Sequence, residues 1–150
     1  MVHAKTILSG ADRSAVAAAI GYVEKKTSGE IRVSVRQQRH RKEQRQSIEQ
    51  LARNEFALLG MANTKHRTGV LIFLLLEDRA FHILGDEGIH AKVGDERWQV
   101  IAREMSAYFK KNDFRGGILH AVTEVGKVLA DNFPRAADDT SELSNDVRIG

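Results

Sequence analysis

The chain contains no cysteine, and this absence excludes disulfide bonds and thiolate chemistry. Long hydrophobic runs are also missing. The longest, residues 70–76, is far too short to span a bilayer, and residues 1–9 lack the apolar run of a signal peptide. We therefore expect a soluble protein without a transmembrane segment and favour a cytoplasmic location. The 150 residues, 42% of them hydrophobic, suffice for one domain with an ordinary core.

The formal net charge of +3 is distributed unevenly along the chain. The residues after Pro134 are net acidic, which leaves 21 basic and 16 acidic residues, or +5, in the rest. This charge is concentrated in one basic stretch, which contains Arg36, Arg39, Arg41, Lys42 and Arg45. The stretch could contact an acidic protein, anionic lipid or nucleic acid. Because no aromatic residues are interleaved with it, we expect no sequence-specific nucleic-acid recognition.

The first forty residues predict a helix followed by a strand. Ser9 and Asp12 have the spacing of a capping box, and apolar residues then recur on one helical face, so we expect a helix from about residue 10 to about 27. Gly29 is suited to end it. In residues 30–36 apolar and polar side chains alternate, which predicts a strand with one polar face.

The next hundred residues supply the other elements of an α/β domain. An apolar stripe between Ile48 and Leu59 predicts a helix, and the unbroken apolar run 70–76 predicts a strand covered on both faces. Two strands joined through a helix should lie parallel with a right-handed crossover. Residues 77–79 form a polar turn before the apolar segment 80–84, which favours an antiparallel hairpin at that edge.

The remainder predicts two further helices and a polar tail. Residues 89–93 fit either a strand or one helical turn, whereas the apolar spacing in 98–109 and 118–129 is typical of helices. Trp98 is expected to be a core anchor. The composition turns polar after Phe133 and Pro134, so we expect a single domain over residues 1–134 and a disordered polar tail over 135–150.

The order of these motifs resembles that of the TPM domain family, which includes thylakoid-lumen phosphatase-like and photosystem II repair-type proteins. The resemblance spans roughly residues 8–134. It is carried by Thr-Ser-Gly-Glu-Ile-Arg-Val at 27–33, Leu-Leu-Gly-Met at 58–61, Thr-Gly-Val-Leu-Ile at 68–72, Asp78-Arg79, Ile-Leu-Gly-Asp at 83–86, Trp98, Phe-Arg-Gly-Gly-Ile at 114–118 and Phe133-Pro134. It implies a three-layer α/β/α sandwich around a small, mostly parallel sheet.

The resemblance also implies several functions, because family members are tied to acid phosphatase activity, divalent-cation binding and the repair or assembly of membrane complexes. A fold by itself does not choose among them. Relatives commonly have a leader peptide and often a membrane anchor or a glycine-rich tail, and we expect neither here. Relatives also tend to be acidic after the first strand, where this chain is basic, so we expect a cation site built from that loop to be weakened.

Ligands of open α/β sheets bind outside the carboxyl ends of parallel strands, which here are residues 35–38 and 76–79. Glu77, Asp78 and Asp86 supply carboxylates near that edge and could hold Ca²⁺ or Mg²⁺. The competing interpretation is that these acidic residues only serve turn geometry.

A phosphoryl group is the second candidate ligand of this edge. Arg36, Arg39 and Arg79 could bind it in a bidentate manner, with Asp78 as nucleophile or acid/base. The chain has no Walker-type glycine loop, no cysteine nucleophile and no compact His-Asp cluster, and we expect His82 and His90 to be ordinary surface or edge side chains.

Taken together, the sequence favours a soluble TPM-like α/β module with a binding or accessory role, for which divalent-cation binding is one hypothesis. The first alternative is a metal-assisted acid phosphatase. The second is an interaction module whose basic loop binds an unknown protein or another anionic partner.

Overall fold

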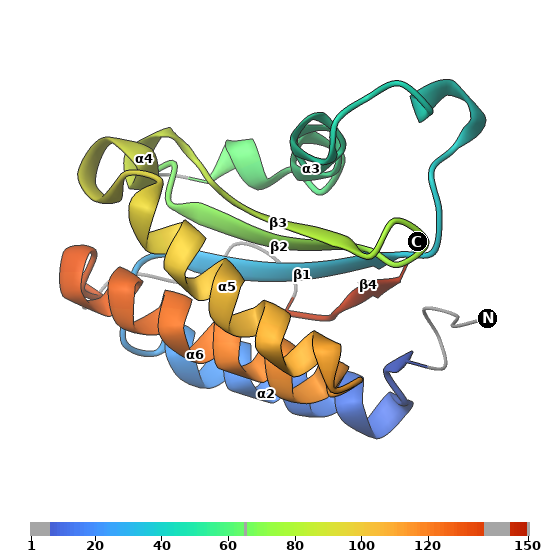
Figure 1. Ribbon diagram of the computed structural model, residues 1–150. Helices are drawn as coiled ribbons and strands as arrows, with labels where there is room; N and C mark the ends of the chain where they lie inside the picture. Colours follow the sequence, from blue (N-terminus) through green and yellow to red (C-terminus); the bar gives the residue numbers. More distant parts are fainter. Residues whose placement is uncertain (1–6, 65, 137–144, 150) are drawn as a thin grey trace.

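The computed structural model describes residues 7–64, 66–136 and 145–149. Figure 1 shows a sheet with helices on both sides. In chain order the elements are α2 (Gly10–Glu24), β1 (Glu30–Arg36), η1 (Arg41–Glu43), α3 (Ile48–Leu58), η2 (Met61–Asn63), β2 (Gly69–Leu75), β3 (Ala80–Gly85), α4 (Glu87–Val93), α5 (Glu96–Lys110), α6 (Phe114–Asn132) and β4 (Arg148–Ile149).

The sheet has the strand order β3-β2-β1-β4. β1 and β2 are parallel in a register that runs from Glu30 opposite Gly69 to Arg36 opposite Leu75, and β3 returns antiparallel to β2. Helix α3 covers one face, whereas α2, α5 and α6 cover the other (Figure 1). The expected α/β/α sandwich, with its parallel pair and antiparallel edge hairpin, is confirmed.

Local signals place the helix ends close to where the sequence puts them. Ser9 and Asp12 form the expected capping box, although α2 ends at Glu24, about three residues earlier than predicted. Gly60 ends the α3 segment with a φ of 71°, which glycine adopts without strain. Residues 89–93 belong to helix α4, for which the Asp86 side chain accepts a hydrogen bond from the Glu87 N–H.

The core consists of two apolar clusters, one on each face of the sheet. The larger lies between the sheet and α2, α5 and α6 and includes Trp98, which is 5% exposed, as expected for a core anchor. The smaller lies under α3 and includes Leu51, Phe56 and Phe73. Within the described residues, no helix combines the length and the apolar character needed to cross a membrane.

The polar face predicted for β1 does not face solvent, because all seven residues of the strand are buried. The buried charges are paired instead. Arg32 donates to Glu24 at 2.6 Å and to Glu30 at 3.2 Å, and all three side chains are at most 5% exposed. The alternation in the sequence therefore marks a buried ionic face and not a surface.

Part of the polar tail also enters the sheet. Arg148 and Ile149 form β4, which lies parallel to β1 with Ser34 opposite Arg148. Glu55 of α3 is 3% exposed and accepts hydrogen bonds from Ser34 and, at 3.1 Å, from Arg148. The expectation of a disordered tail does not hold for residues 148 and 149, because this buried carboxylate and the open side of β1 receive them. Residues 137–144 and 150 lie outside the described residues.

We predict that Arg32→Met lowers the free energy of unfolding by about 3–5 kcal/mol, because it removes the cation between two buried carboxylates. Urea denaturation measures this change. The control is Arg53→Met on α3, whose side chain is 57% exposed and pairs with Glu49 at the surface. This control should cost less than about 0.5 kcal/mol. Equal losses in the two variants would contradict the importance of the buried pairs.

Candidate functional site

The carboxyl ends of β1 and β2 meet at one rim of the sheet, as the parallel pairing requires. The Leu76 N–H donates to the Arg36 carbonyl and the Glu77 N–H donates to the Gln37 carbonyl, both at 2.9 Å. Arg36, Glu77, Asp78 and Arg79 are therefore neighbours, as the sequence predicted.

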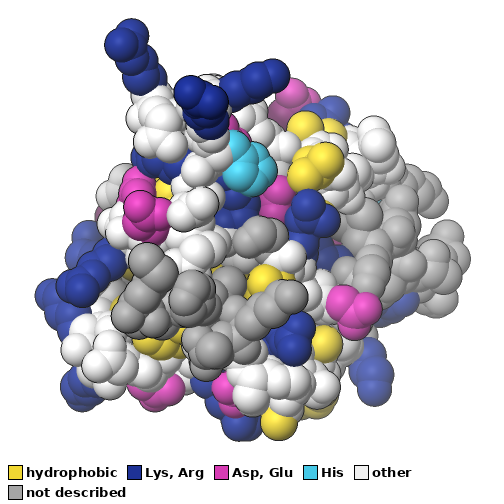
Figure 2. All heavy atoms as spheres, turned by 90° about the vertical axis from the view of Figure 1, so that its right-hand side faces the viewer, with side chains coloured by type: hydrophobic (Ala, Val, Ile, Leu, Met, Phe, Trp, Pro, Cys, Tyr) yellow, Lys and Arg dark blue, Asp and Glu magenta, His cyan; other side chains and the backbone are white. Residues whose placement is uncertain are grey.

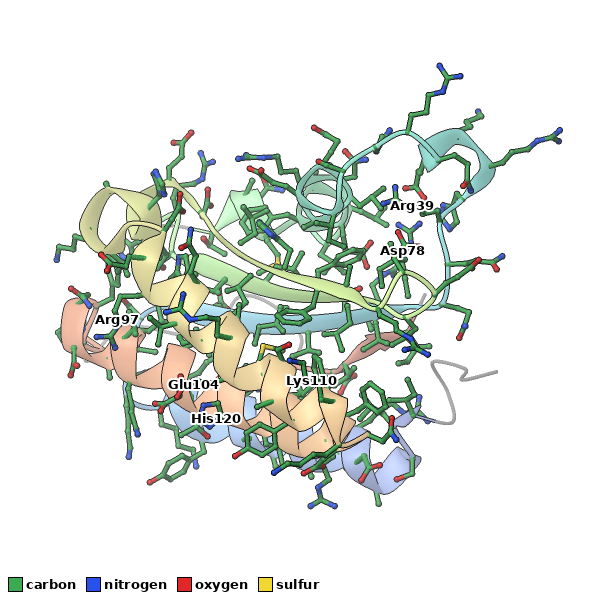
Figure 3. The ribbon with its side chains drawn as sticks, viewed as in Figure 1. Arg39, Asp78, Arg97, Glu104, Lys110 and His120 are labelled. Atoms are coloured by element: carbon green, nitrogen blue, oxygen red, sulfur yellow. The ribbon has the colours of Figure 1, made fainter. Side chains whose placement is uncertain are left out.

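Ion pairs already occupy most of the charged groups at this rim. Arg36 is buried and bonded to Glu43, and its hydrogen bond is the main cause that lowers the pKa of the Glu43 carboxyl. Arg39 Nε donates to Asp78 Oδ2 at 2.8 Å, and the two labelled side chains face one another in Figure 3. Arg79 is exposed in the turn with a φ of 50°. Two of the three arginines predicted to bind an anion are thus held by carboxylates of the protein itself.

Asp86 does not join Glu77 and Asp78. It follows β3, which runs away from the rim for six residues, so it lies about 20 Å away at the other end of the sheet. There its side chain is 4% exposed and bonded to Arg67 in a bidentate pair, at 2.8 and 2.9 Å. The three carboxylates proposed to hold Ca²⁺ or Mg²⁺ are therefore not brought together, and only Glu77 and Asp78 lie at the rim.

Three cations of the basic stretch remain at the surface. Arg41, Lys42 and Arg45 are exposed on and beside η1, and none forms an ion pair or a side-chain hydrogen bond within the described part of the chain. Figure 2 shows Lys and Arg side chains that project from the top of the molecule, where this segment lies in Figure 1. The paired residues Arg36 and Arg39 anchor the base of the projecting segment.

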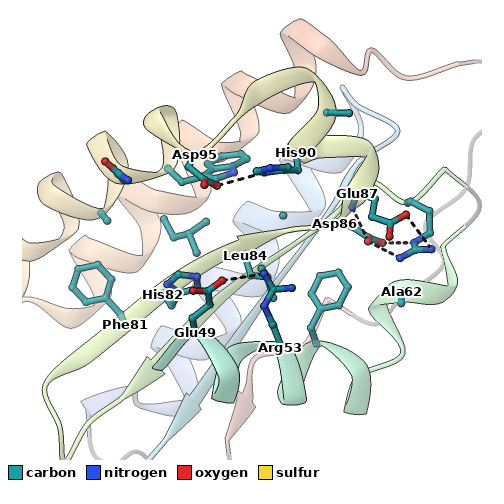
Figure 4. A pocket seen from close by; sticks show the side chains of 18 residues that line it. Glu49, Arg53, Ala62, Phe81, His82, Leu84, Asp86, Glu87, His90 and Asp95 are labelled. Atoms are coloured by element: carbon teal, nitrogen blue, oxygen red, sulfur yellow. Dashed lines mark hydrogen bonds and ion pairs between the residues drawn. The ribbon is translucent and has the colours of Figure 1, made fainter. Parts of the chain in front are cut away.

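A separate groove of about 680 Å³ follows the outer side of β3. Seven consecutive residues, 81–87, line it. Because successive side chains of a strand point to opposite faces, a cavity that touches all of them must face the edge of the sheet. Its two walls come from different helices (Figure 4): Glu49, Arg53 and Phe56 from α3, and Trp98, Gln99 and Ala102 from α5.

The edge that faces the groove carries unpaired backbone groups. The Asp86 N–H donates to the Gly69 carbonyl at 2.9 Å, and even-numbered residues of β3 point toward β2 in the same way. The odd-numbered residues consequently direct one N–H and one C=O each away from the sheet. β3 is the terminal strand of the sheet among the described residues. The outward-directed residues are Phe81, Ile83 and Gly85.

Comparison with known proteins identifies the family of this fold. The model of the TPM domain matches residues 1–128. The chain belongs to the TPM domain family. The NMR structure of BA42 protein from the psychrophilic bacterium Bizionia argentinensis is 35% identical, with 95% of each chain covered and a TM-score of 0.86.

A second solved structure shares the fold at lower identity. The N-terminal domain of a protein from P. gingivalis is 18% identical over 87% of this chain and 82% of that one, with a TM-score of 0.71. No curated protein gives a significant match. The family is established, therefore, while its members' activities do not transfer on these grounds.

The charged groups inside the groove of this TPM domain are mostly paired with each other. Glu49 and Arg53 are 2.9 Å apart, and His90 Nδ1 lies 3.5 Å from Asp95 Oδ1 (Figure 4). His82 is the exception. Burial lowers the pKa of its imidazole, the nearby Glu49 raises it, and Arg53 lowers it again. The net shift is downward, so burial in the groove favours the neutral form of the His82 imidazole over the charged form.

The sequence contained part of the information needed to find this groove. The hairpin prediction already placed β3 at an edge, and an edge strand has unpaired backbone groups by definition. What the sequence did not contain is the spacing of α3 and α5, which leaves the edge uncovered. His82 was expected to be an edge side chain, and it is one, but it is an edge side chain within a groove.

We predict that the His82 pKa lies below its ordinary value of 6.5. A histidine with a lowered folded-state pKa binds fewer protons when folded than when unfolded, so its contribution to stability is complete above pH 6.5 and is lost as the pH falls from there through the folded pKa. Chemical denaturation from pH 7.5 to 5 should show this loss, and His82→Gln should reduce it.

NMR titration of the imidazole tests the same point directly. Glu49→Gln removes the charge that raises the His82 pKa, so the midpoint should move further down. A wild-type midpoint at or above 6.5 would contradict the predicted effect of burial.

Proposed function

We propose that this TPM domain is a protein-binding module that receives an extended segment of a partner along β3. The observation that carries the proposal is the groove on the open edge, with three outward-directed donors and three acceptors at its floor. A segment added to a sheet edge gains main-chain hydrogen bonds, and pockets beside the edge select its side chains. This role agrees with the binding or accessory role that the sequence favoured.

The walls of the groove support a partner with apolar side chains at alternate positions. An added strand would direct successive side chains toward α3 and α5 in turn. Phe56 lies on the α3 side and Ala102 on the α5 side, while the ion pairs Glu49–Arg53 and Arg67–Asp86 satisfy much of the charge. Main-chain pairing would thus supply affinity, and the two apolar patches would supply selectivity.

The basic segment supports a second candidate, the capture of an acidic partner. Its specific support is that Arg41, Lys42 and Arg45 are exposed and carry no ion pair with any described residue. Charges of one sign on a projecting segment attract an oppositely charged partner and raise the association rate. Cation binding by Glu77, Asp78 and Asp86 and phosphatase chemistry at Asp78 stay predictions, and in either role Asp78 would first have to give up its bond to Arg39.

To test the groove, we would select peptides from a random-sequence display library on the full chain and compare Phe81→Pro with Phe81→Ala. Both variants lose the ring, which packs on Phe109 with centroids 5.3 Å apart, but only proline also removes an outward N–H. We expect the proline variant to bind the selected peptides up to about tenfold more weakly than the alanine variant, since a lost main-chain hydrogen bond costs about 0.5–1.5 kcal/mol.

Hydrogen exchange of the outward amides gives an independent result. Bound peptide should slow exchange at Ile83 and Gly85, because those amides become donors in the added pairing. Peptides that bind equally well to both Phe81 variants, or that protect amides elsewhere on the domain, would overturn the proposal.

For the basic segment, we predict that the triple change of Arg41, Lys42 and Arg45 to Glu weakens binding of poly-glutamate in low salt by more than about tenfold. The matched control changes three exposed cations of α5, Arg97, Arg103 and Lys110, to Glu and so alters the net charge equally. Equal losses in both triple variants would show an effect of net charge alone and would refute a site at η1.

A further inference from the structure

A cluster of three side chains on the helical face opposite α3 is not used by either proposed interaction. Glu104 lies on α5, and His120 and Glu124 lie one turn apart on α6. One ligand atom from each lies within 4.8 Å of the other two. Figure 3 labels Glu104 and His120, whose side chains come together from the two adjacent helices. Side chains four residues apart share a helix face, so α6 offers two ligands toward one on α5.

We infer that Glu104, His120 and Glu124 form a site for a first-row transition-metal dication such as Zn²⁺. The distance from His120 Nε2 to Glu104 Oε2 is 3.5 Å. Two ligands about 2.0–2.1 Å from a tetrahedral metal are separated by about 3.4 Å, which this pair matches. The same distance is too long for a good hydrogen bond between nitrogen and oxygen.

The imidazole nitrogen provides a second, independent observation. His120 Nε2 is buried, and no described residue gives it a hydrogen-bond partner. The ring lies beside that of Tyr108, with centroids 5.4 Å apart, and the side chain is 23% exposed. A buried polar nitrogen without a partner loses hydration without compensation, and a bound metal would provide that compensation.

The ligand types select the metal. One imidazole nitrogen and two carboxylates suit Zn²⁺, Co²⁺ or Ni²⁺, whereas Ca²⁺ and Mg²⁺ prefer oxygen ligands throughout. Two carboxylates and a neutral imidazole also balance the dication's charge. Lys127 Nζ now lies 3.2 Å from Glu124, but this surface pair is weak and its cation would leave when the metal binds.

Three protein ligands leave a fourth tetrahedral position open. Glu104 is 45% exposed and Glu124 is 27% exposed, so this position faces solvent, and water would fill it. The site would connect α5 to α6 across their interface and would thereby stabilise this half of the helical layer.

The experiment titrates the full chain with ZnCl₂ against a chromophoric chelator and records NMR spectra of the imidazoles. We expect one Zn²⁺ per chain and a shift of the His120 ring signals. Glu104→Gln and His120→Gln should each weaken binding by more than about tenfold, because even changes to outer-shell groups cost 10–100-fold. CaCl₂ and MgCl₂ should leave the His120 signals in place.

The matched control is His90→Gln. His90 also lies 3.5 Å from a carboxylate, that of Asp95, but no third ligand joins this pair among the described residues. The His90→Gln variant should therefore bind Zn²⁺ as the wild type does. Denaturation in the presence of EDTA shows whether the His120→Gln variant is folded without metal. If it is not, Glu104→Gln still tests the site, because it changes only a surface side chain. Absence of Zn²⁺ binding, binding that survives Glu104→Gln, or binding that falls equally with His90→Gln would each overturn the site.

Discussion

The arrangement of this domain depends on charge compensation along β1. The strand lies at the middle of the sheet and is buried, yet it presents Arg32, Ser34 and Arg36 on one face. Removing such groups from water is costly unless each finds a partner. Three glutamates from three different segments provide these partners: Glu24 at the end of α2, Glu55 on α3 and Glu43 on η1.

The two edges of the sheet differ as a result. On the β1 side, Glu55 also binds Arg148, and β4 pairs with Ser34 and Val35 and so covers part of that edge. On the β3 side the described chain adds no strand, and the helices stand apart enough to leave a groove. Since exposed edges invite pairing with another chain, this asymmetry is the reason that we propose β3 as the docking edge of this domain.

Much of the fold could be predicted from the sequence, because the spacing of apolar residues and the positions of turn residues indicate the same strands. The alternation in 30–36, the apolar run 70–76 and the polar turn before β3 led to the correct pairing of β1, β2 and β3, whereas the short strand β4 was not predicted. The rim was predicted for the same reason. The predicted cation ligands Glu77, Asp78 and Asp86 do not come together, because β3 runs antiparallel to β2 and carries Asp86 to the other end of the sheet. The predicted hairpin already implied this separation. Pairing of Arg32 with Glu24 depends on helix packing, and no local pattern reveals it.

The three glutamates opposite β1 have a consequence for how the chain reaches its native state. Each belongs to a separate segment, so the buried polar side chains of β1 do not all have these partners until α2, η1 and α3 have docked. Forms without α2 or η1 would leave Arg32 or Arg36 without one of its carboxylates, forms without α3 would leave the Ser34 hydroxyl without its acceptor, and all of them would be disfavoured. Acquisition of structure should accordingly be all-or-none for these segments, with no stable sub-assembly from which one of them is missing.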